Sequence, residues 1–264
     1  MAKRSALKTR AGARAAVGAP PAHAPRVTSP ARTGRIESLD AARGIAIVAM
    51  IAYHFCFDLR YFGVTQWDFE HDIRWLSARA AILSSFLLIA GISAVLANRQ
   101  AWPLAHWLRH IGVIALAALL VTAGSYLMFP GSFIWFGVLH AIALSLLLAK
   151  PLLPRPLLAA LAGISMIAAG SVYSNPLFDG RMLGWVGFMT AKPAAEDYVP
   201  LFPWMGVLLL GIALGHLLVR TRFAVLAPLA RLPAALRLLG RHSLAVYLLH
   251  QPLMIGALRL LLGP

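Results

Sequence analysis

Seven apolar segments, each about as long as a lipid bilayer is thick, constrain this chain more than any other feature. A helix crosses the hydrocarbon core in roughly 17–25 residues, and segments near that length recur along the sequence. They occupy residues 41–57, 80–97, 111–129, 133–149, 156–173, 201–219 and 243–260. The pattern predicts an all-α fold, a polytopic integral membrane bundle of about seven transmembrane helices.

The composition excludes most other classes of protein. Hydrophobic residues make up 60% of the 264 residues, charged residues only 12%, and the mean hydropathy is +0.75. Soluble domains hold roughly 45–50% apolar and about 25% charged residues, so a soluble enzyme, a secreted module and a disordered protein are excluded. A transmembrane barrel does not fit either, because its strands are alternating segments of about 10 residues, whereas these apolar residues form continuous blocks.

Basic residues at the start of the chain and beside the apolar segments predict its orientation. Residues 1–35 hold eight Lys and Arg and no acidic residue, so 1–34 is predicted to be a disordered basic tail before one transmembrane domain at 35–264. An organelle transit peptide is the lesser alternative. An inside N-terminus places 18 of the 24 Lys and Arg inside and seven of the nine acidic residues outside. The positive-inside rule therefore predicts a cytoplasmic N-terminus and an outer C-terminus, and the net charge of +15 reflects topology rather than nucleic-acid binding.

The regions between the spans complete this topology. Residues 223–239 contain two Pro and two Arg and are expected to lie along the membrane interface. Outer loops at about 58–79 and 174–200 are rich in aromatic residues, which suit the interface and sugar stacking. The single Cys56 excludes an intramolecular disulfide and a thiolate metal cluster, and no metal site is expected. The Ala- and Arg-rich composition favours a bacterial inner membrane.

A stripe of polar residues follows one face of the first span. Arg43 and His54 are 11 residues apart, which leaves them about 20° out of alignment and roughly 16 Å apart along a helix. Asp40 and Asp58 fall near the same line. Because a charge at the bilayer centre costs about 2.5–3.5 kcal/mol, this face must meet protein or water.

His54 is the member of this stripe that ordinary helix chemistry does not explain. Helix capping and interfacial anchoring account for Asp40, Arg43 and Asp58, but not for an imidazole about one turn below the outer end. Asp58 lies four residues from His54, within reach to orient its ring. His54 and Asp58 are therefore the predicted catalytic residues.

Other polar side chains are expected at membrane depth. His140 lies within an apolar segment, and Tyr247 and His250 share one face of the last span. Trp204 lies in the PLFPWMG sequence (200–206) that opens the sixth span. Because His54, His140 and His250 lie on separate helices, they are expected to share a cavity, although an intramembrane histidine can also serve only as a bond between helices. His140, Trp204, Tyr247 and His250 are the predicted substrate-binding residues.

Four segments resemble a known family. They are RIESLDAARGIAIVAMIAYHFCFDL (35–59), FGVLHAIALSLLL (136–148), PLFPWMGVLLLGIALG (200–215) and LGRHSLAVYLLHQPLM (239–254). Together they resemble the catalytic domain of heparan-alpha-glucosaminide N-acetyltransferase and its compact bacterial relatives, within the wider transmembrane acyltransferases that include the acyltransferase-3 family. The spacing from Arg43 to His54 matches the Arg-x10-His signature of that wider group.

The resemblance implies acyl transfer from cytoplasmic acyl-coenzyme A, acetyl-coenzyme A above all, to an acceptor on the far side. His54 would be the catalytic histidine, as base or acyl carrier, and Arg43 would help to anchor the donor. Arg109 and Arg241 are candidates for a basic rim that binds its phosphates, though both also serve as topology signals. The acyl-coenzyme A is a co-substrate, with no tightly bound cofactor. Because the chain is short and lacks a luminal domain, a bacterial glycan or lipid-linked sugar is the expected acceptor. Membrane lipid is the other expected partner, and the oligomeric state is left open.

Three other functions remain open from the sequence. His54, His140 and His250 could ligate a haem in an electron carrier. A transporter or flippase could use His/Asp relays, although no internal repeat of the inverted-repeat kind is visible. A structural membrane protein could use its polar residues only to join helices.

Overall fold

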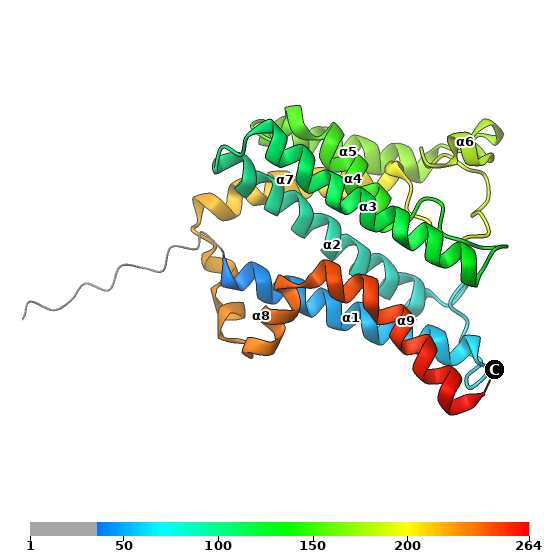
Figure 1. Ribbon diagram of the computed structural model, residues 1–264. Coiled ribbons are helices and arrows are strands. Elements are labelled where there is room, and N and C mark those ends of the chain that lie inside the picture. The colour runs from blue at the N-terminus through cyan, green and yellow to red at the C-terminus, as the bar shows by residue number, and fades with distance from the viewer. Residues whose placement is uncertain (1–35, 264) are drawn as a thin grey trace, which may run out of the picture. The chain divides into compact units, whose positions relative to one another are not determined.

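The computed structural model describes residues 36–263, and the predicted tail at 1–34 lies outside them. Within that range the chain folds into helices that run back and forth along one direction (Figure 1). No strand forms among these residues, and one isolated bridge pairs Phe136 with Tyr198. The long apolar helices are α1 (Glu37–Tyr61), α2 (Ile73–Arg99), α3 (Leu104–Met128), α4 (Val138–Leu148), α5 (Pro156–Val172), α7 (Leu201–Arg220) and α9 (Ser243–Leu262).

Short helices fill the connections. Two are α-helical, α6 (Arg181–Gly184) and α8 (Ala234–Arg241), and three are 3-10 turns at Lys150–Leu152, Pro176–Phe178 and Ala224–Arg231. The 3-10 helix Ala224–Arg231 and α8 together form the segment at 223–239 that we expected along the membrane interface. In the structure this segment packs against α1.

The predicted polytopic helical membrane fold is confirmed. Five helices among the described residues, α1, α2, α3, α7 and α9, are long and apolar enough to cross a membrane, and α4 and α5 are shorter apolar helices of 11 and 17 residues. The predicted spans at 156–173, 201–219 and 243–260 match α5, α7 and α9 to within two residues. Helix α1 extends four residues beyond 41–57 at both ends, and α2 and α3 begin seven residues before 80–97 and 111–129.

The predicted span at 133–149 is wrong at its start, because α4 begins only at Val138. Residues before it are apolar but pair with a distant loop instead of forming a helix. Val199 N–H donates to the Phe136 carbonyl at 3.1 Å, and Glu196 N–H donates to the Ser132 carbonyl at 2.9 Å. Hydropathy alone could not reveal this pairing.

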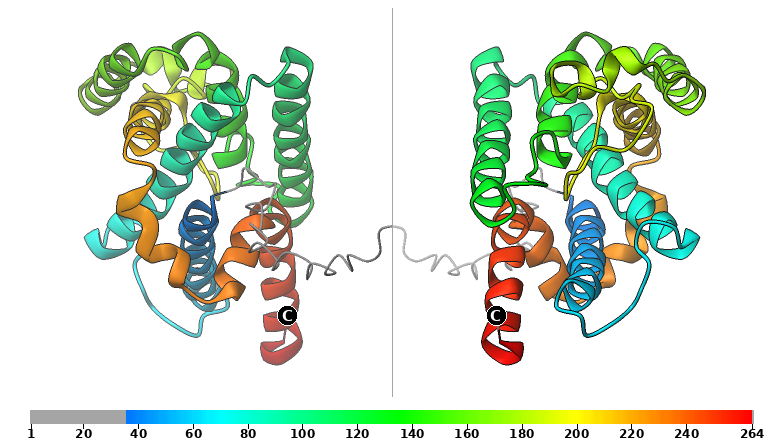
Figure 2. Two further views of the ribbon diagram at one scale, coloured as in Figure 1. Left: turned by 90° about the vertical axis from the view of Figure 1, so that its left-hand side faces the viewer. Right: turned by 90° about the vertical axis from the view of Figure 1, so that its right-hand side faces the viewer.

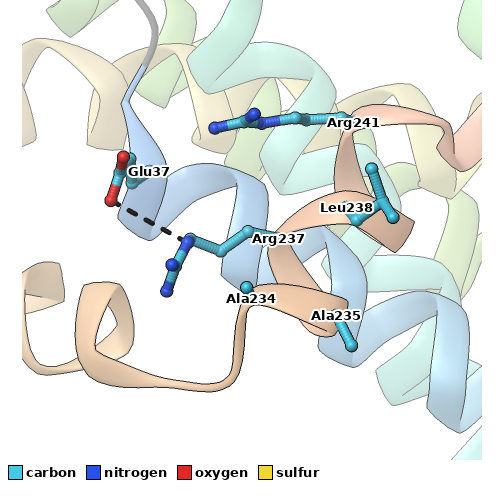
Figure 3. A pocket seen from close by; sticks show the side chains of 6 residues that line it. All are labelled: Glu37, Ala234, Ala235, Arg237, Leu238 and Arg241. Carbon is cyan, nitrogen blue, oxygen red and sulfur yellow. Dashed lines mark ion pairs between the residues drawn. The ribbon is translucent and has the colours of Figure 1, made fainter.

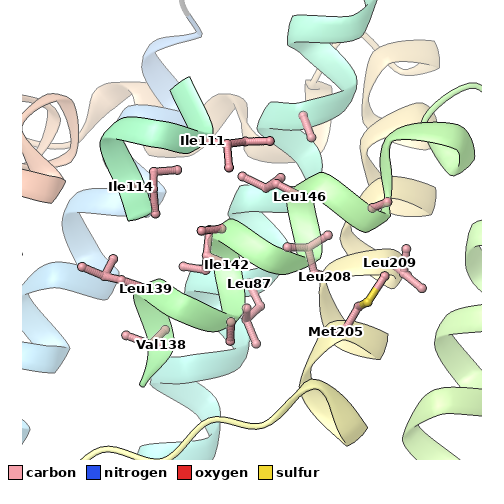
Figure 4. Close-up of a cluster of buried hydrophobic side chains, with 14 of the residues drawn as sticks. Leu87, Ile111, Ile114, Val138, Leu139, Ile142, Leu146, Met205, Leu208 and Leu209 are labelled. Carbon is pink, nitrogen blue, oxygen red and sulfur yellow. The ribbon is translucent and has the colours of Figure 1, made fainter. Parts of the chain in front are cut away.

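The main core surrounds α7. Helices α2 and α5 pack along α7 on different sides, and the end-on views show α7 between them (Figure 2). Leu208 and Ile212 of α7 are fully buried. Figure 4 shows part of this cluster, in which side chains of α4 and α7 meet Leu87 of α2. Helix α1 stands outside this core and is held by α2, α8, α9 and the 3-10 helix Ala224–Arg231.

Two glycines allow α8 to lie against the start of α1. A Cβ on Gly44 would collide with the backbone of Leu236, and a Cβ on Gly240 would collide with the Asp40 carbonyl. Small residues permit such close backbone approach between helices in a membrane. The contact places Arg241, the neighbour of Gly240, beside α1.

We predict that Gly240→Ala displaces α8 and destabilises the protein by about 1–3 kcal/mol, because overpacking a tight contact forces backbone shifts. The measurement is the free energy of unfolding in detergent, from titration with sodium dodecyl sulfate. Gly112→Ala is the matched control, since a Cβ there meets nothing within 4 Å and alanine is favoured in a helix by up to about 1 kcal/mol. Equal stability changes for the two variants would contradict this packing.

Candidate functional site

The last helix brings a second histidine to the predicted catalytic one. Helices α1 and α9 pack together, and the rings of His54 and His250 lie 5.1 Å apart between centroids, at 61° to one another. His54 is half-buried, and His250 is buried at 8% exposure. Of the predicted site residues, these two histidines are in direct ring contact although 196 positions separate them in the sequence.

Asp58 is engaged by α9 rather than by His54. Its side chain is buried, and the Gln251 amide donates a hydrogen bond to Asp58 Oδ1 at 2.6 Å. Within residues 36–263 no hydrogen bond joins His54 to Asp58. The expectation that Asp58 orients the His54 imidazole is therefore corrected, because the carboxylate turns towards an amide donor on the neighbouring helix. Sequence reasoning gave Gln251 no role, and its only signal was its place beside His250.

His250 Nε2 is a hydrogen-bond acceptor that carries no proton. Its Nδ1 lies 2.7 Å from the Tyr247 carbonyl oxygen, and a carbonyl can only accept, so Nδ1 carries the proton. In a neutral imidazole Nε2 is then unprotonated. This Nε2 is buried without a partner among the described residues, as are Asp58 Oδ2 and Gln251 Oε1.

Three unpartnered acceptors thus occur at the α1–α9 contact. Leaving a buried polar atom without a hydrogen bond costs about 1–3 kcal/mol, and hydrocarbon offers no replacement. Such a centre matches a ligand or water that brings hydrogen-bond donors. It does not resemble a contact that serves only to join two helices.

A separate basic cluster lies near the N-terminal end of α1. Asp40, which is buried, accepts from Arg43 at 3.2 Å and from Arg241 at 3.3 Å. Arg43 also donates to Ser93 Oγ of α2 at 2.9 Å. The structure therefore brings together two of the three predicted donor-binding arginines, from helices about 200 residues apart in the chain, on one carboxylate.

A cavity of about 300 Å³ adjoins this cluster (Figure 3). Arg237 spans it to Glu37 at 3.8 Å and donates to the Ala230 and Leu232 carbonyls at 2.9 and 2.6 Å. Arg241 also lines the cavity, with 43% of its side chain exposed. The remaining lining residues are Ala234, Ala235 and Leu238.

The third predicted arginine, Arg109, is not bonded to this cluster. It is exposed on α3, and no hydrogen bond or ion pair among residues 36–263 joins it to Arg43 or Arg241. Its neighbour His110 instead lies close enough to Arg43 for an electrostatic interaction. Sequence reasoning gave no role to His110, because a histidine in the first turns of a span also suits the interface.

His140 and Trp204, two of the predicted substrate-binding residues, have other partners than the histidine pair. Gly137 N–H donates to His140 Nδ1 at 3.2 Å, and His140 Nε2 lies 3.3 Å from Thr122 Oγ1. These contacts fix the start of α4 to α3 and occupy both ring nitrogens. Trp204 packs against the core around α7. No ring contact or hydrogen bond of the described residues joins either of them to His54.

Tyr247 connects the histidine pair to a partly buried acid that sequence reasoning missed. Its ring lies 5.7 Å from that of His250, and it interacts electrostatically with Asp197. Asp197 accepts a hydrogen bond from Val138 N–H at the start of α4, at 2.8 Å. Burial raises the pKa of Asp197, while Arg79 and Lys192 oppose this shift. Nothing in the local sequence distinguishes it from the other acids of its loop.

The fold and this centre define a polytopic helical membrane protein with buried polar groups between its first and last long helices. A comparison with protein families matches residues 35–252 to the family described as heparan-alpha-glucosaminide N-acetyltransferase, catalytic. The chain belongs to this family, which confirms the resemblance and indicates a membrane-bound transferase. Neither the curated proteins nor the solved structures contain a match.

We predict that Asp58 and Gln251 are energetically coupled. A double-mutant cycle of Asp58→Ala and Gln251→Ala should give a coupling of about 1–3 kcal/mol in the free energy of unfolding, the range for a hydrogen bond to a carboxylate. A second cycle, Asp58→Ala with Gln100→Ala, is the control, because Gln100 bonds Trp102 beyond the far end of α2. Additive effects in the first cycle would show that the observed hydrogen bond contributes nothing.

We also predict a pH-dependent effect of Asp197. The raised pKa means that the folded chain holds this proton more tightly, so its stability contribution is full below the ordinary pKa of 3.8 and is lost as pH rises through the folded value. Asp197→Asn keeps an acceptor for Val138 N–H and removes the partly buried charge. Its unfolding temperature should exceed that of the wild type, increasingly so from about pH 4 to pH 7. A lower unfolding temperature across that range would refute the raised pKa.

Proposed function

We propose that this protein is a membrane-embedded acyltransferase that moves an acyl group, chiefly acetyl, from acyl-coenzyme A to a sugar or other glycan acceptor. The paired imidazoles of His54 and His250 carry this proposal. They lie beside unpartnered acceptor atoms in a chain of a transferase family. A transporter or flippase forms no covalent product, and it would use these histidines only to relay protons.

The basic cluster suits the donor. Coenzyme A phosphates cannot enter hydrocarbon, and arginine binds phosphate through paired hydrogen bonds. Arg43 and Arg241 converge at one end of α1, and Arg43 is 11 residues from His54, roughly 16 Å along the helix. An extended pantetheine arm covers a distance of this order, so phosphates held at the arginines leave the thioester near His54.

The unpartnered acceptors suit the other substrate. Asp58 Oδ2 and Gln251 Oε1 can both receive hydrogen bonds from a ligand. Sugar hydroxyls and amines bring several donors at once. This complementarity favours a carbohydrate acceptor entering from the C-terminal end of α1, where the aromatic loops lie.

The chemistry then requires one base and one route for the proton. His54 takes the proton of the acceptor hydroxyl or amine as that atom bonds to the thioester carbon. When the tetrahedral intermediate collapses, the carbon–sulfur bond breaks and His54 returns the proton to the leaving thiolate. The products are the acylated acceptor and free coenzyme A. Tyr247, whose ring lies beside that of His250, is a candidate donor to the oxyanion.

In this proposal acyl-coenzyme A enters from the arginine end of α1 and the acceptor enters from its C-terminal end, on the opposite side of the membrane. We propose that the N-terminus is cytoplasmic and that the protein lies in a bacterial inner membrane, as the distribution of basic residues favours. Fusions of alkaline phosphatase to the loops 62–72 and 221–233 test the orientation. Activity at the first fusion and none at the second supports it, and the reverse overturns it.

We predict that His54→Ala lowers transfer by a factor of about 100 to 10,000, the usual contribution of a positioned base, while insertion and stability remain normal. The assay uses purified protein in vesicles with radiolabelled acetyl-coenzyme A and glucosamine, and mass spectrometry of envelope glycans from a deletion strain supplements it. His216→Ala is the matched control, a histidine on α7 that bonds the Leu153 carbonyl far from His54. Normal transfer by His54→Ala would remove His54 from this role.

A further inference from the structure

We propose that His250 is a positioning residue that accepts a hydrogen bond from His54 and so fixes which nitrogen of His54 is the base. The inference rests on the proposed acyl transfer and refines it. The orienting partner expected from sequence was Asp58, but the structure commits that carboxylate to Gln251. The α9 imidazole occupies the place beside His54 instead.

The backbone of α9 determines what His250 can offer. Its Nδ1–H donates to the Tyr247 carbonyl three residues earlier, at 2.7 Å. Nε2 therefore presents a lone pair and no proton. Since both the carbonyl and the ring belong to one turn of one helix, this tautomer is maintained wherever α9 is helical.

The His54 ring is the nearer of the two rings beside His250 that could donate to Nε2. His250 Nε2 is buried without a partner among the described residues. The ring centroid of His54 lies 5.1 Å from that of His250, against 5.7 Å for Tyr247, and the Gln251 amide already donates to Asp58. The ring separation of 5.1 Å leaves room for one N–H···N contact between imidazole edges, and catalytic hydrogen bonds that are long without substrate shorten when it binds.

This arrangement assigns each proton. One His54 nitrogen carries a hydrogen that points to His250 Nε2, and the other nitrogen is bare and receives the acceptor proton. The resulting imidazolium keeps its hydrogen bond to His250, and the new proton passes to the coenzyme A thiolate. His250 neither gains nor loses a proton. Neutral imidazole thereby performs the orienting task that a carboxylate performs in hydrolase triads, without adding a second charge at membrane depth.

The first test observes the tautomer directly and needs no enzyme activity. Protein labelled with ¹⁵N-histidine is studied by NMR in detergent, and loss of one signal set in His250→Gln assigns His250 among the nine histidines. We expect the His250 proton on Nδ1 and an unprotonated Nε2. A proton on Nε2 would overturn the inference whatever the protein catalyses.

The second test compares two replacements of His250 in the acetyl-coenzyme A and glucosamine assay. His250→Gln retains a side-chain acceptor, whereas His250→Leu has similar bulk and none. We expect His250→Leu to lower kcat by about 100-fold or more and to leave the KM for acetyl-coenzyme A unchanged. The His250→Gln variant should retain at least about a tenth of the wild-type kcat. His216→Leu, the matched control on α7, should keep normal kcat.

The outcomes separate this inference from the proposed function. If the wild type transfers acetyl and His250→Leu is as active, the function stands and the positioning role falls. Equal losses in the Gln and Leu variants would also reject it, because a purely structural role predicts no rescue by an acceptor. If the wild type transfers nothing, acyl transfer to this acceptor fails, and the NMR result alone decides the state of His250.

Discussion

Hydrocarbon supplies no hydrogen-bond partners, and this constraint determines how α1 is held. Each polar group of α1 must find its partner on another helix or at the ends of the bundle. Asp40 binds Arg241 of α8, Asp58 binds Gln251 of α9, and His54 meets His250 of α9. Polar contacts therefore join α8 and α9 to α1, in addition to the close glycine packing of α8, whereas α2, α5 and α7 pack through an apolar core.

The apolar core around α7 and the polar contacts of α1 therefore have different roles. The apolar core around α7 can hold the bundle together without the polar groups, so the α1–α9 contact is free to keep atoms whose hydrogen bonds are incomplete. Unpartnered acceptors at Asp58, His250 and Gln251 would weaken a purely structural contact. In a transferase Asp58 and Gln251 are groups that a substrate can satisfy, and the arginines on Asp40 provide a matching charge for the other substrate.

Much of the fold could be predicted from the sequence, but the partners within the site could not. Hydropathy located the apolar helices, and helical periodicity put Arg43, His54 and Asp58 on one face of α1. Hydropathy failed at α4, where Phe136 is apolar yet pairs with Val199 in a loop. Helical periodicity could not show that Asp58 binds an amide 193 residues away, because the pattern within one helix does not reveal which neighbouring helix lies opposite. The same limit hid His110 and Asp197.

The central claim, that a donor thiol reaches position 54 from the arginine end, can be measured by disulfide capture. In a Cys56→Ser background, which removes the only native cysteine, His54→Cys is treated in vesicles with coenzyme A disulfide, and mass spectrometry detects the mixed disulfide. The account predicts an adduct at position 54 that is greatly reduced by Arg43→Ala, with none at Phe55→Cys on the exposed face of α1. No adduct at position 54, or equal labelling at 54 and 55, would contradict it.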